Sequence, residues 1–221
     1  MSKLSLIESS LLCLCLMCIT VSLACPIAHR QALLQFKHSL IRNSSTDEIL
    51  FDLESWNSSP DCCQWERVVC DSSNSALKPV IALDLSKLYL GSFAVMAPIF
   101  NIKSLTKLDV SKNFLQGEIP IWKLARLNRL VYLDMSYNNL SASIPSLLFS
   151  LRNLEHLDLT GNSFCGELSS HVRNLSKLKF LGLACNSLSG EIRKEIAKLV
   201  RLQNLWLHGN RFSRKVPNSI L

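Results

Sequence analysis

The sequence predicts an α/β solenoid, a right-handed superhelix of stacked coils with a parallel sheet on the concave side and 3₁₀ or irregular segments on the convex side. One observation behind this prediction is a segment of fixed pattern that recurs every 24 or 25 residues. The other is a cysteine-containing block that precedes the repeats and is suited to cover the open end of the stack. Apolar residues make up 48% of the 221, which excludes a disordered chain.

Residues 1–24 have the pattern of a secretory signal peptide. Lys3 gives a weakly basic start, an apolar run of 14 residues extends from Leu11 to Ala24, and Ser22 and Ala24 supply the small side chains that a signal peptidase requires. The run is too short to cross about 30 Å of hydrocarbon. We therefore expect a secreted, extracellular protein, which would be a single-pass protein of the plasma membrane if the native chain extends further.

The predicted cap covers residues 25–78. Apolar residues at helical spacing between Leu33 and Ile41 predict one helix, and those between Ile49 and Trp56 predict a second, shorter one. Cysteines of a secreted protein form disulfides, so we expect the cap to be closed by them. The sequence by itself leaves three pairings open for the four cysteines of the cap, which are Cys25, Cys62, Cys63 and Cys70.

Modification sites follow from the same extracellular interpretation. Four sequons predict glycans that face the solvent, at Asn43, Asn57, Asn139 and Asn174. Cys165 and Cys185 occupy different positions of adjacent coils, which places them roughly 10 Å or more apart along the strands, too far for a disulfide. We expect two separate thiols, of which Cys185 is the more exposed.

The repeats occupy residues 79–221 and make about six coils. Five segments share the pattern L-x-x-L-x-L-x-x-N, the leucine-rich repeat signature, and they end at Asn113, Asn138, Asn162, Asn186 and Asn210. In each segment the Leu-x-Leu is a strand whose alternate side chains point into the coil. The asparagine amide can bond backbone groups that the following turn leaves unpaired. An earlier copy has Leu88 at the asparagine position, so we expect a looser first coil.

A second pattern follows each asparagine, as in Leu115-Gln-Gly-Glu-Ile119-Pro120 and Leu140-Ser-Ala-Ser-Ile144-Pro145. This L-x-G-x-I-P element resembles the plant-specific class of leucine-rich repeat. The resemblance implies a short extra strand and 3₁₀ turns, rather than full helices, on the outer side of each coil.

Three segments of the cap make the resemblance more specific. Arg30-Gln-Ala-Leu-Leu-Gln-Phe-Lys37, Ser55-Trp56-Asn57 and the Cys-Cys-x-Trp-x-x-Val-x-Cys run that ends at Cys70 look like the amino-terminal cap of plant receptor-like proteins. Those proteins are extracellular leucine-rich repeat receptors without a kinase. The resemblance implies the pairings Cys25–Cys62 and Cys63–Cys70, and it puts Arg67 where many relatives have glycine.

The same resemblance implies a ligand-sensing ectodomain in defence or developmental signalling. Such an ectodomain binds an extracellular peptide or protein ligand and signals through a kinase co-receptor. Strand residues beside the inward leucines face the concave side, where aromatic side chains with polar neighbours favour recognition. We expect ligand contacts from Tyr132, Tyr137, His156, Phe180, Trp206 and His208.

Catalysis is not predicted. The five histidines are scattered, and no phosphate loop, metal-ligand cluster or nucleophile elbow occurs in the sequence. A column of aspartates, Asp84, Asp109, Asp134 and Asp158, belongs to the repeat consensus and does not by itself predict a cation. We therefore expect no enzyme activity, no cofactor, no metal and no nucleic-acid partner.

Positive charge is concentrated near the carboxyl end. From Ser169 to Leu221 there are ten Lys or Arg against two Glu, whereas the whole chain has a formal net charge of +7. A solvated flank is the simpler interpretation. The sharper hypothesis is attraction to an anionic cell-wall polysaccharide or an acidic co-receptor, which salt would weaken.

A short secreted inhibitor, resembling plant polygalacturonase inhibitors, is the alternative function. A complete inhibitor needs a closing cap with its own cysteines, and the sequence stops at Leu221 without one. We therefore expect a portion of a longer receptor, and we expect residues 25–221 alone to aggregate or dimerise through the last coil.

Overall fold

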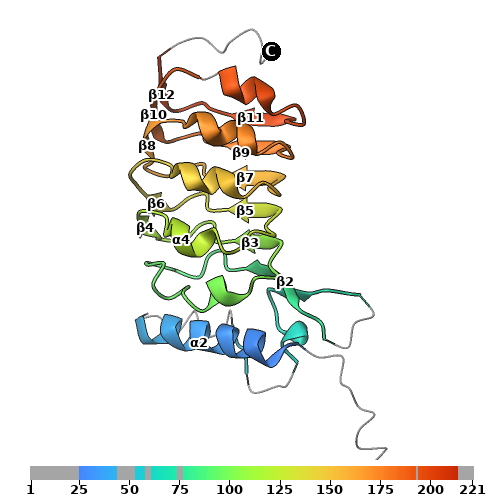
Figure 1. The fold of residues 1–221 in the computed structure, drawn as a ribbon. Helices are drawn as coiled ribbons and strands as arrows, with labels where there is room; N and C mark the ends of the chain where they lie inside the picture. The colour runs from blue at the N-terminus through green and yellow to red at the C-terminus, as the bar shows by residue number, and fades with distance from the viewer. Residues whose placement is uncertain (1–24, 44–52, 58–60, 74–76, 193, 214–221) are drawn as a thin grey trace, which may run out of the picture.

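The computed structural model of the chain describes residues 25–43, 53–57, 61–73, 77–192 and 194–213. They form a column of stacked coils with the cap helix at one end (Figure 1). The expected signal peptide, residues 1–24, lies outside the described residues. Within the described ranges, no helix combines the length and the apolar character that crossing a bilayer requires.

The concave side of the stack is a seven-stranded sheet. Its strands lie in chain order: β1 (Val68–Cys70), β2 (Val80–Asp84), β3 (Lys107–Asp109), β5 (Tyr132–Asp134), β7 (His156–Asp158), β9 (Phe180–Gly182) and β11 (Asn204–Trp206). β1 is antiparallel to β2, and all other neighbours are parallel. Each coil adds one strand in register, so that Leu133 pairs with Leu108 on one side and Leu157 on the other.

Shorter elements complete each coil. A lateral two-stranded sheet joins β4 (Gln116–Gly117) to β6 (Asn139–Leu140), and a three-stranded one contains β8 (Cys165–Glu167), β10 (Ser187–Gly190) and β12 (Arg211–Phe212). The outer side carries η2 (Ile99–Asn101), α4 (Ile121–Leu124), η3 (Ser146–Ser150), η4 (Ser170–Asn174) and η5 (Lys194–Lys198). The extra strand and the 3₁₀ turns that the resemblance implies are confirmed.

A ribbon of leucines forms the core. Equivalent residues of successive coils, such as Leu108, Leu133, Leu157 and Leu181, are 0–1% exposed. Burial of one leucine side chain contributes about 1.5–3 kcal/mol, so this ribbon is the main stabilising element. In the last described coil, Leu205 and Leu207 are only partly buried.

The repeated asparagines tie each coil to the one before it. The Asn138 Oδ1 accepts from the Leu115 N–H at 3.0 Å. Its Nδ2 donates at 3.0–3.2 Å to three carbonyls, those of Val110, Met135 and Ser136. The asparagines of the other coils make the corresponding bonds. The predicted role of the asparagine is therefore confirmed, and we call this set of bonds the asparagine ladder.

The first coil is not left out of the ladder. Asn113 Oδ1 accepts from the backbone N–H of both Leu88 and Leu90, at 2.9 and 3.0 Å. The Leu88 side chain is fully buried. The asparagine of the next coil therefore supplies acceptors to this coil although Leu88 replaces its own asparagine, and the expected looseness of the coil stays a prediction.

The cap has one long helix and a cluster of aromatic side chains. The first expected helix is α2 (Ile27–Asn43). The second is not seen in the part of it that the structure describes, where residues 53–57 make a turn. Trp56 lies between Phe36 and Trp65, with ring centroids 6.0 and 5.8 Å apart. Lys37 Nζ donates to the carbonyls of Leu53 and Trp56 and so fixes this turn on the helix.

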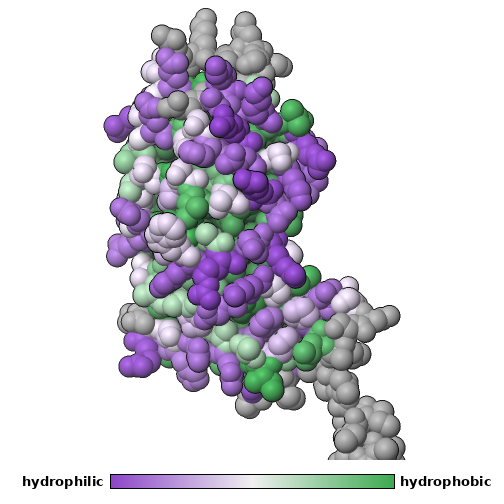
Figure 2. Space-filling view, in the orientation of Figure 1, coloured by the Kyte–Doolittle hydropathy of each residue, from purple (hydrophilic) through white to green (hydrophobic). Residues whose placement is uncertain are grey.

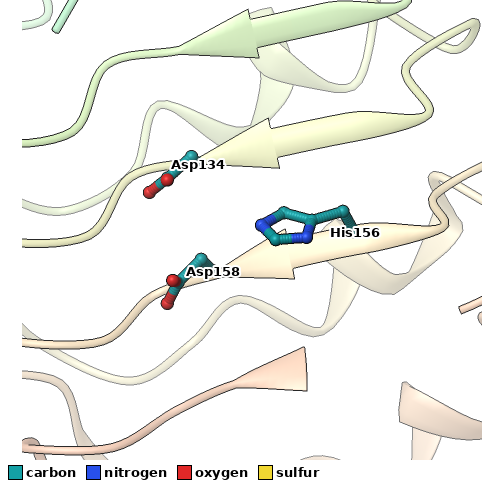
Figure 3. Close-up of side chains that lie close together, drawn as sticks. All are labelled: Asp134, His156 and Asp158. Carbon is teal, nitrogen blue, oxygen red and sulfur yellow. The ribbon is translucent and has the colours of Figure 1, made fainter. Parts of the chain in front are cut away.

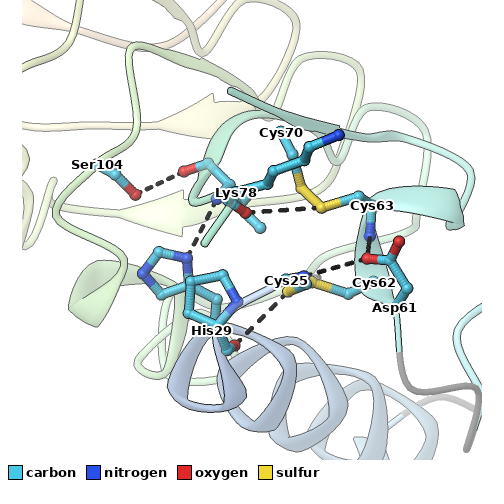
Figure 4. Close-up of a disulfide and its surroundings, with 10 residues drawn as sticks. Cys25, His29, Asp61, Cys62, Cys63, Cys70, Lys78 and Ser104 are labelled. Atoms are coloured by element: carbon cyan, nitrogen blue, oxygen red, sulfur yellow. Dashed lines mark hydrogen bonds between the residues drawn. A yellow bond between two sulfur atoms is a disulfide. The ribbon is translucent and has the colours of Figure 1, made fainter. Parts of the chain in front are cut away.

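Two disulfides close the cap (Figure 4). Cys25 is bonded to Cys62 and Cys63 to Cys70, with Cα–Cα distances of 5.4 and 5.5 Å, which is the pairing that the resemblance implies. Asp61 Oδ1 accepts from the backbone N–H of Cys25 at 3.1 Å and of Cys63 at 3.0 Å. One carboxylate oxygen therefore links both disulfides.

The cap joins the repeats at β2. The Val80 N–H donates to His29 Nδ1 at 3.1 Å, and Ser104 Oγ donates to the Val80 carbonyl at 2.6 Å. Burial lowers the pKa of His29, which favours the neutral ring that can accept at Nδ1. Arg67 has φ of 66°, the left-handed conformation that glycine adopts without strain. Its Nη1 donates to the Ser86 carbonyl at 3.0 Å.

Candidate binding surface

A column of rings crosses the concave sheet. Tyr132, His156 and Phe180 occupy the same position in β5, β7 and β9 and pair in register. The ring centroids of Tyr132 and His156 are 4.2 Å apart at 8°, and those of His156 and Phe180 are 4.3 Å apart at 9°. Parallel strands about 4.8 Å apart bring equivalent side chains to stacking distance. The sheet therefore holds the rings in a fixed order.

Other side chains extend the column at both ends. Trp206 stands two positions later in its coil than Phe180, opposite Gly182, and meets the Phe180 ring edge-on, with centroids 4.9 Å apart. Lys107 Nζ lies 4.7 Å from the Tyr132 ring centroid, a cation–π contact. We call the rings of Tyr132, His156, Phe180 and Trp206 the aromatic column.

A hollow of about 350 Å³ lies beside the aromatic column. Its lining contains three of the four rings and residues on the amino-terminal side of the strands, which are Val131, Glu155, Lys179, Gln203 and Asn204. Glu155 and Lys179 form an exposed ion pair at 2.7 Å, and the hydrogen bond and charge of Lys179 lower the pKa of Glu155. The hollow thus combines an aromatic wall with a charged rim.

A column of carboxylates runs along the other side of the rings. The aspartates at positions 84, 109, 134 and 158 pair in register, and each Oδ1 accepts from the backbone N–H two residues later at 2.8–2.9 Å. Burial raises the pKa of Asp109, the hydrogen bonds from Ser111 oppose this, and the charges of Asp134 and Asp84 raise it further. The carboxylates are therefore close enough to repel one another.

Two of these carboxylates and one ring of the aromatic column lie close together where the two columns meet (Figure 3). One potential ligand atom each from Asp134, His156 and Asp158 lies within 4.8 Å of the others. Burial lowers the pKa of His156, while the charges of Asp134 and Asp158 oppose that shift. In the sequence the histidines are scattered and the aspartates belong to the repeat consensus, so this cluster was not predicted. The signal was present, since His156 and Asp158 share one face of a strand and Asp134 pairs with Asp158.

Two of the six expected ligand contacts lie away from the aromatic column. Tyr137 is in the turn after β5, with φ of 53° and 57% exposure. Its ring lies against Gly161, where an added Cβ would be 2.9 Å from the ring. His208 is exposed in the turn after β11. The structure therefore brings together Tyr132, His156, Phe180 and Trp206, but not these two.

The expected modification sites are distributed over the surface. Asn57 and Asn139 are exposed, Asn174 is partly buried at the end of η4, and Asn43 ends α2. Cys165 and Cys185 are both free and exposed. Glycan attachment at the four asparagines stays a prediction.

Family models match most of the repeats and the cap. The description "Leucine rich repeat N-terminal domain" fits residues 28–71, and two leucine-rich repeat models fit residues 103–164 and 201–221. The chain belongs to the leucine-rich repeat proteins. It is similar to plant receptor-like proteins: receptor-like protein 46 of Arabidopsis thaliana is 42% identical over 109 residues, which are 48% of this chain. The chain spans only 13% of that relative.

Solved structures of plant leucine-rich repeat ectodomains share the fold. The ectodomain of the Arabidopsis thaliana receptor kinase GASSHO1/SCHENGEN3, in complex with CASPARIAN STRIP INTEGRITY FACTOR 2, is 38% identical with a TM-score of 0.69 over 82% of this chain and 21% of that one. The Arabidopsis receptor kinase HAESA, in complex with the peptide hormone IDA and the co-receptor SERK1, is 28% identical with a TM-score of 0.63 over 83% of this chain and 34% of that one.

Proposed function

We propose that this leucine-rich repeat protein is a ligand-sensing ectodomain whose aromatic column and adjoining hollow bind an extracellular peptide or protein. A separate kinase co-receptor carries the signal, in defence or developmental signalling. The observation that carries the proposal is the aromatic column itself. Stacking fixes its rings before a ligand arrives, so binding costs little side-chain entropy at these positions.

The surroundings of the column suit a peptide. Trp206 is 46% exposed and gives a flat apolar surface at one end. Glu155 and Lys179, at the rim of the hollow, offer one acceptor and one donor group to a polar backbone or side chain. An aromatic centre with a polar rim is the usual composition of a recognition surface.

The similar proteins support both a peptide ligand and a co-receptor. The GASSHO1/SCHENGEN3 and HAESA ectodomains were solved with a peptide or factor bound, and HAESA also with SERK1. The likeness to receptor-like protein 46 favours a receptor over the alternative of a short polygalacturonase inhibitor. It also supports an extracellular location, at the plasma membrane.

A second candidate partner is an anionic cell-wall polysaccharide. Hydrophilic side chains gather over the coils near the carboxyl end of the stack (Figure 2). Among the described basic residues there, exposed ones are Arg173, Lys177, Lys194, Lys198, Arg201 and Arg211. These charges could attract polygalacturonate without involving the aromatic column.

The decisive experiment compares an aromatic position in the column with one outside it. Peptides captured from extracellular fluid by the secreted chain are identified by mass spectrometry, and their affinity is then measured. Phe180→Ala is expected to weaken binding at least tenfold, because a central aromatic contact contributes about 2 kcal/mol or more. Trp122→Ala is the matched control, since Trp122 is 81% exposed on α4, outside the concave sheet. Equal affinity of the Phe180 variant and the unmodified chain would refute the proposal.

A further inference from the structure

We propose that Asp134, His156 and Asp158 form a binding site for one divalent transition-metal ion, of which Zn²⁺ is the best match. The inference does not depend on the proposed function. It concerns the junction of the aromatic column with the carboxylates, where nitrogen and oxygen donors converge (Figure 3).

The spacing of the donors fits a single ion. One atom of each side chain lies within 4.8 Å of the other two. In a tetrahedral site with metal–ligand bonds of about 2.1 Å, donor atoms are roughly 3.4 Å apart. Small side-chain rotations therefore close the site. Asp134 and Asp158 come from paired positions of β5 and β7, and His156 is two residues before Asp158, so the sheet supplies all three from one face.

Two buried polar atoms beside Asp158 lack a partner. His156 Nε2 and Thr160 Oγ1 are both buried without a hydrogen bond among the described residues, and the third such atom, Trp65 Nε1, is in the cap. In Figure 3 one edge of the His156 ring, with a nitrogen at its tip, faces the two carboxylates. Buried polar atoms are nearly always paired. A metal ion between the ring and the carboxylates would satisfy the histidine nitrogen.

Thr160 marks the other side of Asp158. Thr160 is 4% exposed and Asp158 is 8% exposed. A Cβ placed on Gly182 would overlap Asp158 Oδ1 and lie 2.8 Å from Thr160 Oγ1, so both oxygens face the same space. The unpaired Thr160 hydroxyl therefore lies on the Gly182 side of the Asp158 carboxylate.

Neighbouring groups hold the three side chains close to the geometry of a metal site. The His156 ring is fixed between Tyr132 and Phe180. The Oδ1 atoms of Asp134 and Asp158 accept from the backbone two residues later, at 2.8 and 2.9 Å. These bonds leave lone pairs of both carboxylates available to an ion. The nearest cation described in contact with the column is Lys107, on the far face of the Tyr132 ring.

The donor set selects the class of metal. One imidazole and two carboxylates suit zinc and neighbouring transition metals, whereas Ca²⁺ takes six to eight oxygens and Mg²⁺ retains most of its water. An arginine of a bound peptide could also meet the carboxylates, but its planar fork of donors matches oxygens that lie side by side. Convergence of a nitrogen and two oxygens on one point favours an ion.

The test is titration of ZnCl₂ into the secreted full chain after treatment with a chelator, followed by calorimetry. We expect one Zn²⁺ per chain and a rise in melting temperature that EDTA reverses. His156→Gln and Asp134→Asn should each weaken binding at least tenfold. Asp84→Asn and His208→Gln are the controls, because they remove the same chemical groups at positions outside the cluster, and they should leave the affinity unchanged.

Three outcomes would overturn the proposal. They are absence of saturable binding, equal loss in the His208 control, and an unchanged affinity in the His156 variant. Circular dichroism and melting of the metal-free variants separate loss of the site from loss of the fold. Asp158→Asn is avoided because that carboxylate is buried. Binding of an arginine peptide that survives EDTA and is lost in Asp134→Asn, without Zn²⁺ binding, would assign the cluster to a cationic side chain instead.

Discussion

Replacing Asn138 with alanine tests the asparagine ladder most directly. The change removes an acceptor from the Leu115 N–H, which has no other acceptor among the described residues and whose residue is fully buried. The three carbonyls that lose the Asn138 amide each keep a second donor, from Asn113, Asn162 or Lys112. Only one backbone group is therefore orphaned.

The expected loss of stability follows from that count. One buried, unpaired N–H costs about 1–3 kcal/mol, and the weaker pairing of the three carbonyls adds to it, so we expect a loss of about 2–4 kcal/mol in the free energy of unfolding. Urea denaturation followed by circular dichroism measures it. Hydrogen exchange should also accelerate in peptides that contain Leu115.

The control is Asn128→Ala. Asn128 is exposed and outside the ladder, and its carbonyl accepts from Asn153 Nδ2 at 3.0 Å, with no side-chain hydrogen bond of Asn128 among the described residues. Its replacement should change stability by less than about 0.5 kcal/mol. If Asn138→Ala costs no more than Asn128→Ala, the ladder does not stabilise the stack and the reasoning is wrong.

Three further predictions concern pH, packing and salt. Burial holds the pKa of His29 below the value of about 6.5 for an exposed histidine. The contribution of the neutral ring to stability is therefore complete above that pH and is lost as the pH falls towards the lowered pKa. In thermal melts, the melting temperature of His29→Gln should fall less between about pH 7 and 5 than that of the unmodified chain. Gly182→Ala should destabilise the chain by about 1–3 kcal/mol by overlap with Asp158, whereas Gly91→Ala, with no atom within 4 Å of the new Cβ, should be nearly neutral in the same denaturation assay. Binding of polygalacturonate should weaken steeply as salt is raised, and salt-insensitive binding, or none, in a pull-down would exclude attraction of the polysaccharide by the basic residues.

The repeat made most of the fold predictable. A pattern of fixed period determines which residues face inward, so the leucine ribbon, the register of the sheet and the role of Asn138 follow from spacing alone. The turn at Leu53–Asn57 did not, because apolar residues in a short segment fit a helix and a buried turn equally well. The hydrogen bonds at Leu88 did not follow from the pattern either, because the acceptors of each coil come from the next coil.

The site was predictable in part. Equal positions in successive coils place Tyr132, His156 and Phe180 side by side, so the stack of rings could be foreseen. Trp206 joins them from a different position of its coil, which only the direction of its side chain shows. The cluster at His156 depends on ring orientation and on the burial of single atoms, and neither can be read from residue types.

The asparagine ladder also sets the order in which the coils can be completed during synthesis. On the ribosome, the Leu115 N–H stays unpaired until Asn138, 23 residues later, has emerged. At about 5–20 residues per second, this delay is about 1–5 s for each coil. Throughout synthesis, therefore, one unfinished coil lies at the growing end, and a chaperone needs to shield only that coil while the cap protects the other end.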